Sequence, residues 1–515
     1  MTTEYSPLLQ QAKPPISRPK PRRRRSSFDP STYNSIGNIT LSGNSEGEEV
    51  NREGLHLLEI LGLTICMAGV QFTWTVELSY GTPYLLSLDL SKELTALVWL
   101  AGPLSGLIVQ PLIGAFSDKC TSRFGKRRPF IVVAGVLTCL SMIGVAYAKE
   151  LGNWAARNLY TTNIEEMSHL FAIIVAVSSF YFLDFTLNAV QAICRALILD
   201  IPPLWQQEYA NAWSARMSNS AMVIGYFVGF VDLVTYTPWL GDSQIKCFCI
   251  VAIVVFISAL AITCLSVKET PYSEELNEQQ HDDQKWYSTL QYIWRAFRFL
   301  PKPIQSLCNT QFFAWMGWFP FLFYSTQWVS DLYFASHPSG DWAEGTRAGS
   351  FAFLCNSIVS VVAGVLLPSL VAHNRLFTLL NLYTASQLII AACLLSAWFI
   401  KSVTMATIMV GIMGIPWAIV LWIPFSLVGE YVSFEDEQRQ KKSNDIEERN
   451  NEFDAGMILG VHNMYIVFPQ FAVAIIAFII FYIATSGNVG IVLAFGGLMA
   501  LVATVMSRHI IRVKK

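Results

Sequence analysis

An acidic side chain inside an apolar segment is the residue of this chain best suited to chemistry. Asp184 lies near the centre of FAIIVAVSSFYFLDFTLNAVQAICRALILD, a segment long enough to cross a membrane. A charged side chain at the middle of a bilayer costs about 2.5–3.5 kcal/mol on insertion scales, so such residues usually face a helix-bundle interior or an aqueous cavity. Asp184 therefore predicts a transport pathway.

Three more polar residues follow Asp184 on the same helical face. Asn188, Gln191 and Arg195 come at steps of four, three and four residues, which keeps them aligned on a helix. We interpret this face as a wet stripe along a translocation path that binds substrate, and polar contact between helices is the alternative. Burial favours the neutral form of a carboxyl group, so we expect Asp184 to take up a proton from one side of the membrane and release it to the other. A structural buried acid is the alternative.

Arg195 is open to more than one role. It lies eleven residues after Asp184, which is about 16 Å along a straight helix and too far for a direct ion pair. Arg195 either contacts substrate, extends its side chain to the membrane surface, or pairs with Asp118 or Asp200.

Glu77 is the second acid inside a predicted span. It is a proton-coupling site, a ligand for hydroxyl groups or a partner of Arg216, and we favour proton coupling. Gln71 and Trp74 precede it in the same segment. We expect these two residues to contact substrate.

Amide and tryptophan side chains replace charged ones in the spans of the second half. The candidate substrate contacts there are Trp315, Asn356, Trp417 and Asn463. Amide hydrogen bonds and aromatic faces suit uncharged, polyhydroxylated molecules. The pattern predicts ion coupling in the first half and binding of a neutral ligand by the second, although any single tryptophan can instead belong to the membrane interface.

A compact basic motif, GAFSDKCTSRFGKRRPF, stands between the second and third predicted spans. An acid at a helix end followed by a tight basic turn can hold neighbouring helix ends in one conformation until substrate shifts the balance. We predict such a conformational latch, and charge that sets membrane topology is a second, compatible reading. The latch candidates are Gly114, Asp118, Arg123, Gly125, Arg127 and Arg128.

Composition places these residues in an all-α membrane protein. The chain is 53% hydrophobic and 14% charged, with a mean hydropathy of +0.42, and segments of about 20 apolar residues match a hydrocarbon core of ~30 Å. Twelve transmembrane helices are expected at 57–85, 94–118, 129–148, 169–200, 210–233, 247–267, 304–334, 347–371, 376–400, 404–432, 454–483 and 487–508.

The spans are arranged six plus six around a hydrophilic stretch. Two six-helix bundles joined by a cytosolic segment suit alternating access, in which one half rocks against the other around a central site. The expected parts are a disordered cytosolic arm (1–56), an N-terminal six-helix bundle (57–267), a cytosolic linker (268–303), a C-terminal six-helix bundle (304–508) and a cytosolic tail (509–515).

Basic residues gather on the side of the membrane that holds the N-terminus when the spans alternate. The positive-inside rule then puts both termini in the cytosol. The ten cysteines show no disulfide or metal spacing. We expect no metal, cofactor or nucleic-acid partner, and a lipid bilayer around the spans. The sequence EYSPLL at Glu4–Leu9 fits a dileucine signal for a vacuolar or lysosomal membrane, but we favour the plasma membrane.

Several strings give the chain a resemblance to a known family. TPYLLSL, VWLAGPLSGLIVQPLIGAFSDKCTSRFGKRRPFI, FLDFTLNAVQAICRALILD, WFPFLFYSTQW, GIPWAIVLWIPFSL and LGVHNMYIVFPQ are spread over nearly all spans. The chain resembles proton-coupled sucrose transporters of the glycoside-pentoside-hexuronide group, close to plant sucrose symporters and fungal α-glucoside permeases. The resemblance implies a major facilitator fold and import of sucrose, maltose or a related α-glucoside with a proton. It also implies that Asp184 is the family's essential acid and Arg195 its arginine in the fourth span.

The chain departs from the plant pattern at positions that bear on substrate choice. Plant members usually have a histidine where this chain has Lys92 and a glutamine where it has Glu77. They usually have an acidic and a basic residue where this chain has Gln327 and Asp331. Maltose or another α-glucoside is therefore as well supported as sucrose. The rival functions are a sodium-coupled or uniporting sugar carrier of the same fold, and a sugar sensor or scaffold without flux. A membrane enzyme is the weakest alternative, since no nucleophile or cofactor constellation is present.

Overall fold

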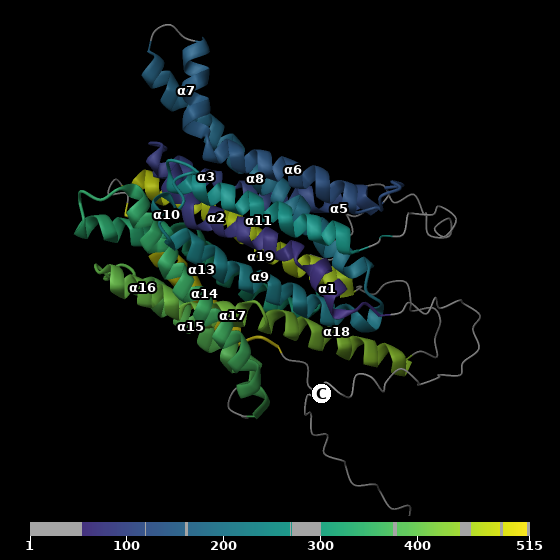
Figure 1. The fold of residues 1–515 in the computed structure, drawn as a ribbon. Helices are drawn as coiled ribbons and strands as arrows, with labels where there is room; N and C mark the ends of the chain where they lie inside the picture. The colour runs from purple at the N-terminus through teal and green to yellow at the C-terminus, as the bar shows by residue number, and fades with distance from the viewer. Residues whose placement is uncertain are drawn as a thin grey trace, which may run out of the picture. The chain divides into compact units, whose positions relative to one another are not determined.

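The computed structural model describes residues 54–118, 120–159, 163–267, 269, 300–373, 378–442, 455–484 and 488–511, and the regular structure in them is helical (Figure 1). The expected N-terminal arm and the linker at 268–303 lie almost wholly outside these residues, as does most of the expected tail at 509–515. The all-α prediction holds throughout the described part of the chain.

Helices follow the six expected spans of the first half. Spans one and two consist of several pieces, which are α1 Leu57–Thr64 and α2 Cys66–Ser87, and then α3 Lys92–Val98, α4 Ala101–Leu104, the π-helical turn η2 Ser105–Val109 and α5 Gln110–Asp118. The next four spans are α6 Arg128–Ala146, α8 Ile164–Asp200, α9 Gln207–Phe230 and α11 Gln244–Ser266. The short helices η3 Leu204–Gln206 and α10 Leu233–Tyr236 lie between them.

The second half repeats this layout. Its spans are α13 Lys302–Ser336, α14 Trp342–His373, α15 Leu379–Ser396, the broken span α16 Val403–Ile412, α17 Gly414–Val420 and α18 Ile423–Lys442, then α19 Ala455–Ile483 and α20 Val489–Ser507. Close backbone approach joins α13 to α20, because a Cβ added to Gly317 would stand 3.0 Å from the Gly496 carbonyl oxygen. Small residues allow this approach in membrane proteins, where packing rather than water drives helix association.

Ten of the twelve expected spans are long and apolar enough to cross a membrane, counted over the described residues. The remaining two expected spans, 210–233 and 304–334, form α9 and α13, which have 24 and 35 residues. Both helices are long enough to cross, but they carry polar side chains that lower their hydropathy. Polar residues in a spanning helix usually face the bundle interior.

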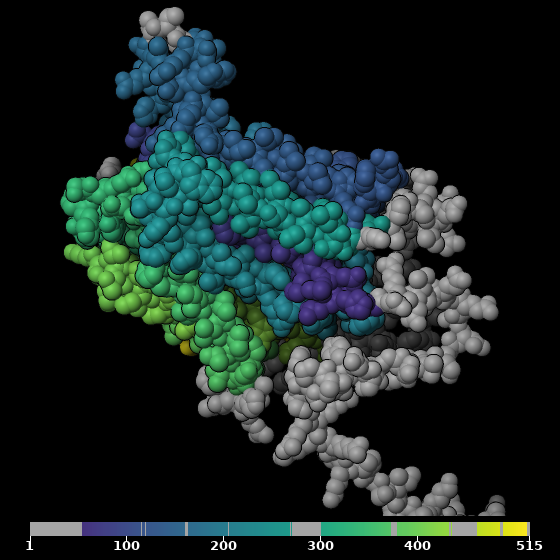
Figure 2. Space-filling view, viewed as in Figure 1, coloured from purple at the N-terminus to yellow at the C-terminus, as the bar shows by residue number. Residues whose placement is uncertain are grey.

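The connection between the third and fourth spans is more ordered than the sequence predicts. It forms a separate helix, α7 Ala148–Leu159, and α8 begins at Ile164 rather than at 169. The 37 residues of α8 extend about 55 Å at 1.5 Å per residue, which exceeds the ~30 Å of a hydrocarbon core. Figures 1 and 2 show α7 set apart from the neighbouring helices, where it packs on the start of α8.

The polar contacts between the two halves gather at one end of the bundle. We call the end that holds the loop 120–128 and the start of α1 the basic end, and the other the opposite end. Polar contacts between the halves lie at the opposite end, where Thr82 donates to the Phe323 carbonyl (2.7 Å) and Thr326 to the Leu78 carbonyl (3.2 Å). Two ion pairs cross the same boundary between the halves, which we call the seam. They join Lys92 to Asp331 (3.7 Å) and Arg347 to Asp232 (2.6 Å).

Aromatic side chains close the same seam. Trp99 stacks on Phe323 with ring centroids 4.2 Å apart, and Tyr226 stacks on Phe353 at 5.2 Å. The Trp99 indole also donates to Thr82, at 3.1 Å. The opposite end is therefore shut by packed rings as well as by polar contacts.

Candidate functional site

The polar stripe of α8 runs from the buried middle of the bundle toward the basic end. Asp184 is 2% exposed and Asn188 is 6% exposed. Gln191 is half-buried and Arg195 is exposed. The stripe thus passes from a protein interior to an accessible surface along one helical face, and its accessible end is the basic end.

Glu77 of α2 meets Asp184 inside the first half. Glu77 is also 2% exposed, and its carboxyl group lies near enough to that of Asp184 for the two to interact electrostatically. Two carboxyl groups can share a hydrogen bond only when one of them is protonated, because two buried like charges in contact repel strongly. Glu77 Oε2 and Asp184 Oδ1 have no hydrogen-bond partner among the described residues. The pair can therefore hold a proton and still accept hydrogen bonds from a ligand.

The backbone around Asp184 is fixed by its neighbours. Ser105 of span two donates to the Asp184 carbonyl oxygen at 3.2 Å, and the Asn188 amide donates to the same oxygen at 2.9 Å. Gly102 faces the carboxyl group, since a Cβ built there would stand 3.7 Å from Asp184 Oδ1. Hydrogen bonds thus fix the backbone of Asp184, and its carboxyl group faces a glycine, which has no side chain.

The partners predicted for Arg195 and Glu77 contact other residues in the structure. Asp118 and Asp200 both contact Arg127, so neither needs Arg195 to balance its charge. Arg216 places its guanidinium over the Trp213 ring, 4.8 Å from the centroid. The contact that the structure gives Glu77 is Asp184, a partner that the sequence analysis did not propose for it.

The second half brings its tryptophans together. The rings of Trp318 and Trp417 lie 5.0 Å apart and those of Trp315 and Trp417 lie 6.2 Å apart, both edge to face. Trp315 and Trp318 are buried, and their indole N–H groups have no acceptor among the described residues. Buried donors without partners are costly. This aromatic cluster can offer two N–H donors and apolar ring faces to a ligand.

The remaining candidate contacts are less uniform. The Asn356 amide donates to the Val410 carbonyl at 2.8 Å and so joins α14 to α16. Asn463 is exposed, whereas Gln71 and Trp74 of α2 are half-buried, with Trp74 against the first-half core. Asn356 therefore has a packing contact that the sequence analysis did not anticipate.

Comparison with known proteins identifies the architecture. The family model described as Major Facilitator Superfamily matches residues 61–440. The chain belongs to the Major Facilitator Superfamily. A general alpha-glucoside permease of Schizosaccharomyces pombe (strain 972 / ATCC 24843) is 31% identical over 88% of this chain and 93% of the relative, and a sucrose transport protein of Oryza sativa subsp. japonica is 26% identical over 79% of each.

Solved structures agree on the fold. A crystal structure of a D-xylose-proton symporter has a TM-score of 0.58 at 15% identity and covers 88% of this chain and 97% of that protein. A nucleoside transporter structure has a TM-score of 0.56 at 13% identity, with 88% and 100% covered. This Major Facilitator Superfamily protein is thus a multipass membrane transporter related to fungal α-glucoside permeases and plant sucrose transporters, and it is not an enzyme.

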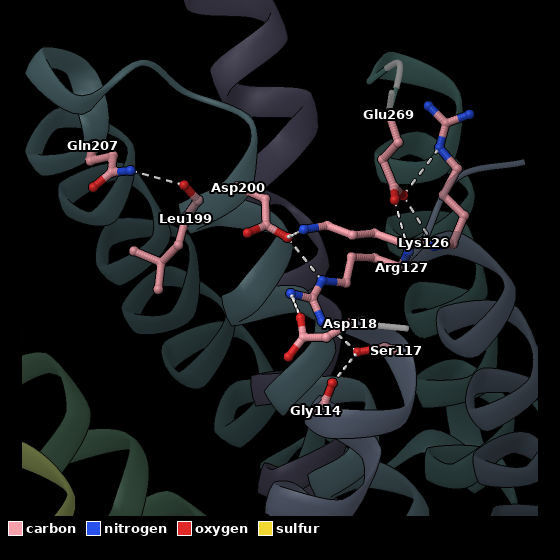
Figure 3. A network of polar contacts seen from close by, with 10 residues as sticks. Gly114, Ser117, Asp118, Lys126, Arg127, Leu199, Asp200, Gln207 and Glu269 are labelled. Atoms are coloured by element: carbon pink, nitrogen blue, oxygen red, sulfur yellow. Dashed lines mark hydrogen bonds and ion pairs between the residues drawn. The ribbon is translucent and has the colours of Figure 1, made fainter. Parts of the chain in front are cut away.

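At the basic end of this transporter, Arg127 lies at the centre of a polar network (Figure 3). It contacts Asp118 at the end of α5 and the Ser117 hydroxyl, and its Nε donates to Asp200 of α8 at 2.9 Å. Lys126 also pairs with Asp200, at 3.0 Å. These contacts connect the ends of spans two, three and four within the first half.

Glu269, just beyond α11, completes the network. Its carboxylate accepts from the backbone N–H groups of Arg127 (2.7 Å) and Arg128 (3.0 Å) at the start of α6. Unpaired N–H groups at a helix N-terminus attract negative charge. Gly125 has φ +105°, and a Cβ there would stand 2.6 Å from Glu269. Glycine is therefore required both for the turn and for the approach of this carboxylate.

The other latch candidates lie at the margin of the network. Arg123 places its guanidinium 4.8 Å from the Phe124 ring centroid, and the Gly114 carbonyl accepts from Ser117 (2.9 Å). Asp200 and Glu269 were not predicted to belong to the latch. Both acids lie at or beyond the ends of spans, where sequence alone cannot show which turn they approach.

Proposed function

We propose that this protein is a proton-coupled symporter that imports sucrose, maltose or a related α-glucoside by alternating access. The observation that carries the proposal is the buried Glu77–Asp184 carboxyl pair, which begins a polar stripe leading to the basic end and whose Oε2 and Oδ1 atoms have no hydrogen-bond partner in the described part of the chain. The names of the fungal and plant relatives support an α-glucoside or sucrose as the substrate.

Charge neutralisation is the switch in this proposal. With one shared proton, the carboxyl pair carries a single negative charge instead of two, and its outer oxygens accept hydrogen bonds from sugar hydroxyls. The loaded site therefore closes around a charge that is hydrogen-bonded to the sugar. Without its proton and without sugar, the pair would carry two uncompensated like charges into a drying cavity, which is costly. Proton and sugar therefore cross together.

The two halves divide the binding task. Asn188, Gln191 and Arg195 supply hydrogen bonds from the first half. The aromatic cluster of Trp315, Trp318 and Trp417 supplies ring faces and indole donors from the second. A neutral sugar, with hydroxyls on its edge and C–H groups on its faces, matches both surfaces.

We further propose that the basic end faces the cytosol, together with both termini, in accord with the positive-inside rule. The closed opposite end and the exposed Arg195 then describe an inward-facing carrier. In this state the network around Arg127 holds spans two, three and four of the first half together as one unit. The plasma membrane is the proposed location, with a vacuolar or lysosomal membrane as the alternative.

Uptake of labelled maltose and sucrose in transporter-deficient cells under voltage clamp tests the proposal. We expect inward currents and accumulation that grow as the external pH falls and that are unchanged when sodium is replaced. Currents that follow sodium, or uptake that never exceeds the external sugar concentration, would support a sodium-coupled carrier or a uniporter instead. Sugar binding without any uptake would support a sensor.

A further inference from the structure

Span two contains one turn of π-helix at a position that faces Asp184. In η2 the backbone N–H of Gln110 bonds to the Ser105 carbonyl, five residues earlier. An α-helix would make this bond to the fourth preceding residue, so the turn contains one extra residue. Such turns are rare and are frequently found at functional sites.

The extra residue changes which side chains of span two face α8. Ser105 donates to the Asp184 carbonyl at 3.2 Å, and Gln110 Nε2 donates to Asn188 Oδ1 at 2.7 Å. Asp184 and Asn188 are one helical turn apart. In a regular α-helix Val109, not Gln110, would lie one turn from Ser105. The π-helical turn therefore aligns an amide, instead of an apolar side chain, with Asn188.

Hydrogen bonds fix the direction of both amides. Asn188 Oδ1 accepts from Gln110, and Asn188 Nδ2 donates to the Asp184 carbonyl at 2.9 Å. One N–H of Asn188 and the Gln110 Oε1 have no partner among the described residues. They form an adjacent donor and acceptor, and a sugar hydroxyl both donates and accepts. Gln110 is half-buried and Asn188 is 6% exposed.

The other half of the transporter approaches at the same turn. A Cβ on Gly106 would stand 3.8 Å from Val467 of α19. Because α19 runs antiparallel to span two, one turn toward the basic end leads from Gly106 to Gln110 and from Val467 to Asn463. Asn463 is exposed. The amide pair and Asn463 thus lie at one level on the two sides of the seam.

We propose that Gln110 and Asn188, aligned by the π-helical turn, form a hydroxyl-binding subsite that holds one ring of the sugar at the level of Asn463. The inference rests on the proposed function and adds Gln110 as a substrate contact. Gln110 belongs to sugar recognition in this scheme, while Glu77 and Asp184 carry the proton. Removing the amide of Gln110 should therefore weaken sugar binding without changing the pH dependence of uptake.

Equilibrium binding of labelled maltose and of its monodeoxy analogues to the purified transporter tests this subsite. Gln110→Leu and Asn188→Leu should each weaken maltose binding about tenfold, the effect of losing a hydrogen bond or two. The double variant should be no weaker than the worse single variant, because the two amides act as a unit. Ile108→Ala, in the same turn but 51% exposed, is the matched control and should bind as the wild type does.

The analogues distinguish recognition from a general structural effect. At least one monodeoxy maltose should bind the wild type about tenfold more weakly than maltose, yet bind Gln110→Leu as well as maltose does. Unchanged maltose affinity in Gln110→Leu, or an equal loss for every analogue, overturns the subsite while proton-driven uptake by the wild type still stands. A wild type that neither binds nor accumulates these sugars overturns the proposed function and the subsite together.

Discussion

The two halves of this transporter share an architecture but bury different chemistry. The first half encloses two interacting carboxyl groups, Glu77 and Asp184, each 2% exposed. The second half buries an aromatic cluster in which the indole N–H groups of Trp315 and Trp318 have no acceptor among the described residues. A pair of acids responds to proton concentration, whereas indoles and rings do not. The comparison predicts that a change in the aromatic cluster of the second half alters sugar affinity without altering proton dependence.

Arg127→Gln has the largest expected effect. It tests whether the pH dependence of uptake is set by the carboxyl pair or by charged residues of the first half in general. Arg127→Gln removes a cation whose side chain is 6% exposed and which contacts two acids. We expect a loss of about 1–3 kcal/mol in stability, since a broken buried pair leaves uncompensated charge and the acids are partly solvated. Thermal unfolding measures the loss, and Arg123→Gln in the same loop should be almost silent.

The pH profile of uptake by Arg127→Gln should equal that of the wild type once uptake is corrected for the amount of folded protein. A change in the pH profile there would mean that distant first-half charges set the coupling, which would weaken the contrast between the halves.

Glu77→Gln tests the carboxyl pair directly. The variant keeps a polar partner for Asp184 but removes the neighbouring negative charge. We expect half-maximal uptake to need about tenfold more protons, because a like charge in contact had favoured the protonated pair. Initial uptake rates at a series of external pH values measure this. A wild-type pH profile would show that Glu77 takes no part in proton binding.

Trp417→Ala is the corresponding change in the second half. It removes the ring that contacts both Trp315 and Trp318. We expect the KM for maltose to rise about fivefold, in keeping with the worth of an aromatic contact, with no shift in pH profile. Trp398→Ala provides the control, since Trp398 is 53% exposed and lies outside the cluster. A shifted pH profile in Trp417→Ala would contradict the division between halves.

The smallest effect concerns the seam where the halves meet. Burial alone would raise the pKa of Asp232, but hydrogen bonds from Arg347 and Thr235 outweigh it and hold that pKa below its usual value. The pair is therefore charged at neutral pH, and its contribution is lost as pH falls through the lowered pKa. Asp232→Asn should raise accessibility from the opposite end about twofold, because partly exposed pairs contribute little.

Cysteine labelling from that end measures the change in the seam. Labelling of Asp232→Asn that equals the wild type at neutral pH would show that aromatic packing alone closes the opposite end.

The sequence predicts those features that depend on one helix at a time. The stripe from Asp184 to Arg195 follows from helical spacing, and hydropathy marks spans such as α6 and α20 with bounds close to those observed. The major facilitator fold follows from the six-plus-six layout and the family resemblance. Helix α7 was missed because its composition is that of an ordinary polar connection.

Features that depend on contact between distant helices were not predicted. Glu77 and Asp184 are more than one hundred positions apart in the chain, and nothing local to either residue shows that they touch. The same holds for Asp200 and Glu269, which meet Arg127 from separate spans. The π-helical turn at Ser105–Val109 adds one residue to a span, which hydropathy does not register.

The most direct test of the account uses Asp184→Asn in proteoliposomes with an imposed pH gradient and no sodium. Wild-type protein should concentrate labelled maltose and move protons with it. The variant should equilibrate the sugar to a ratio of about 1, because no coupling free energy remains, while still exchanging labelled for unlabelled maltose. Uphill accumulation by Asp184→Asn equal to that of the wild type would contradict the assignment of proton coupling to this carboxyl group.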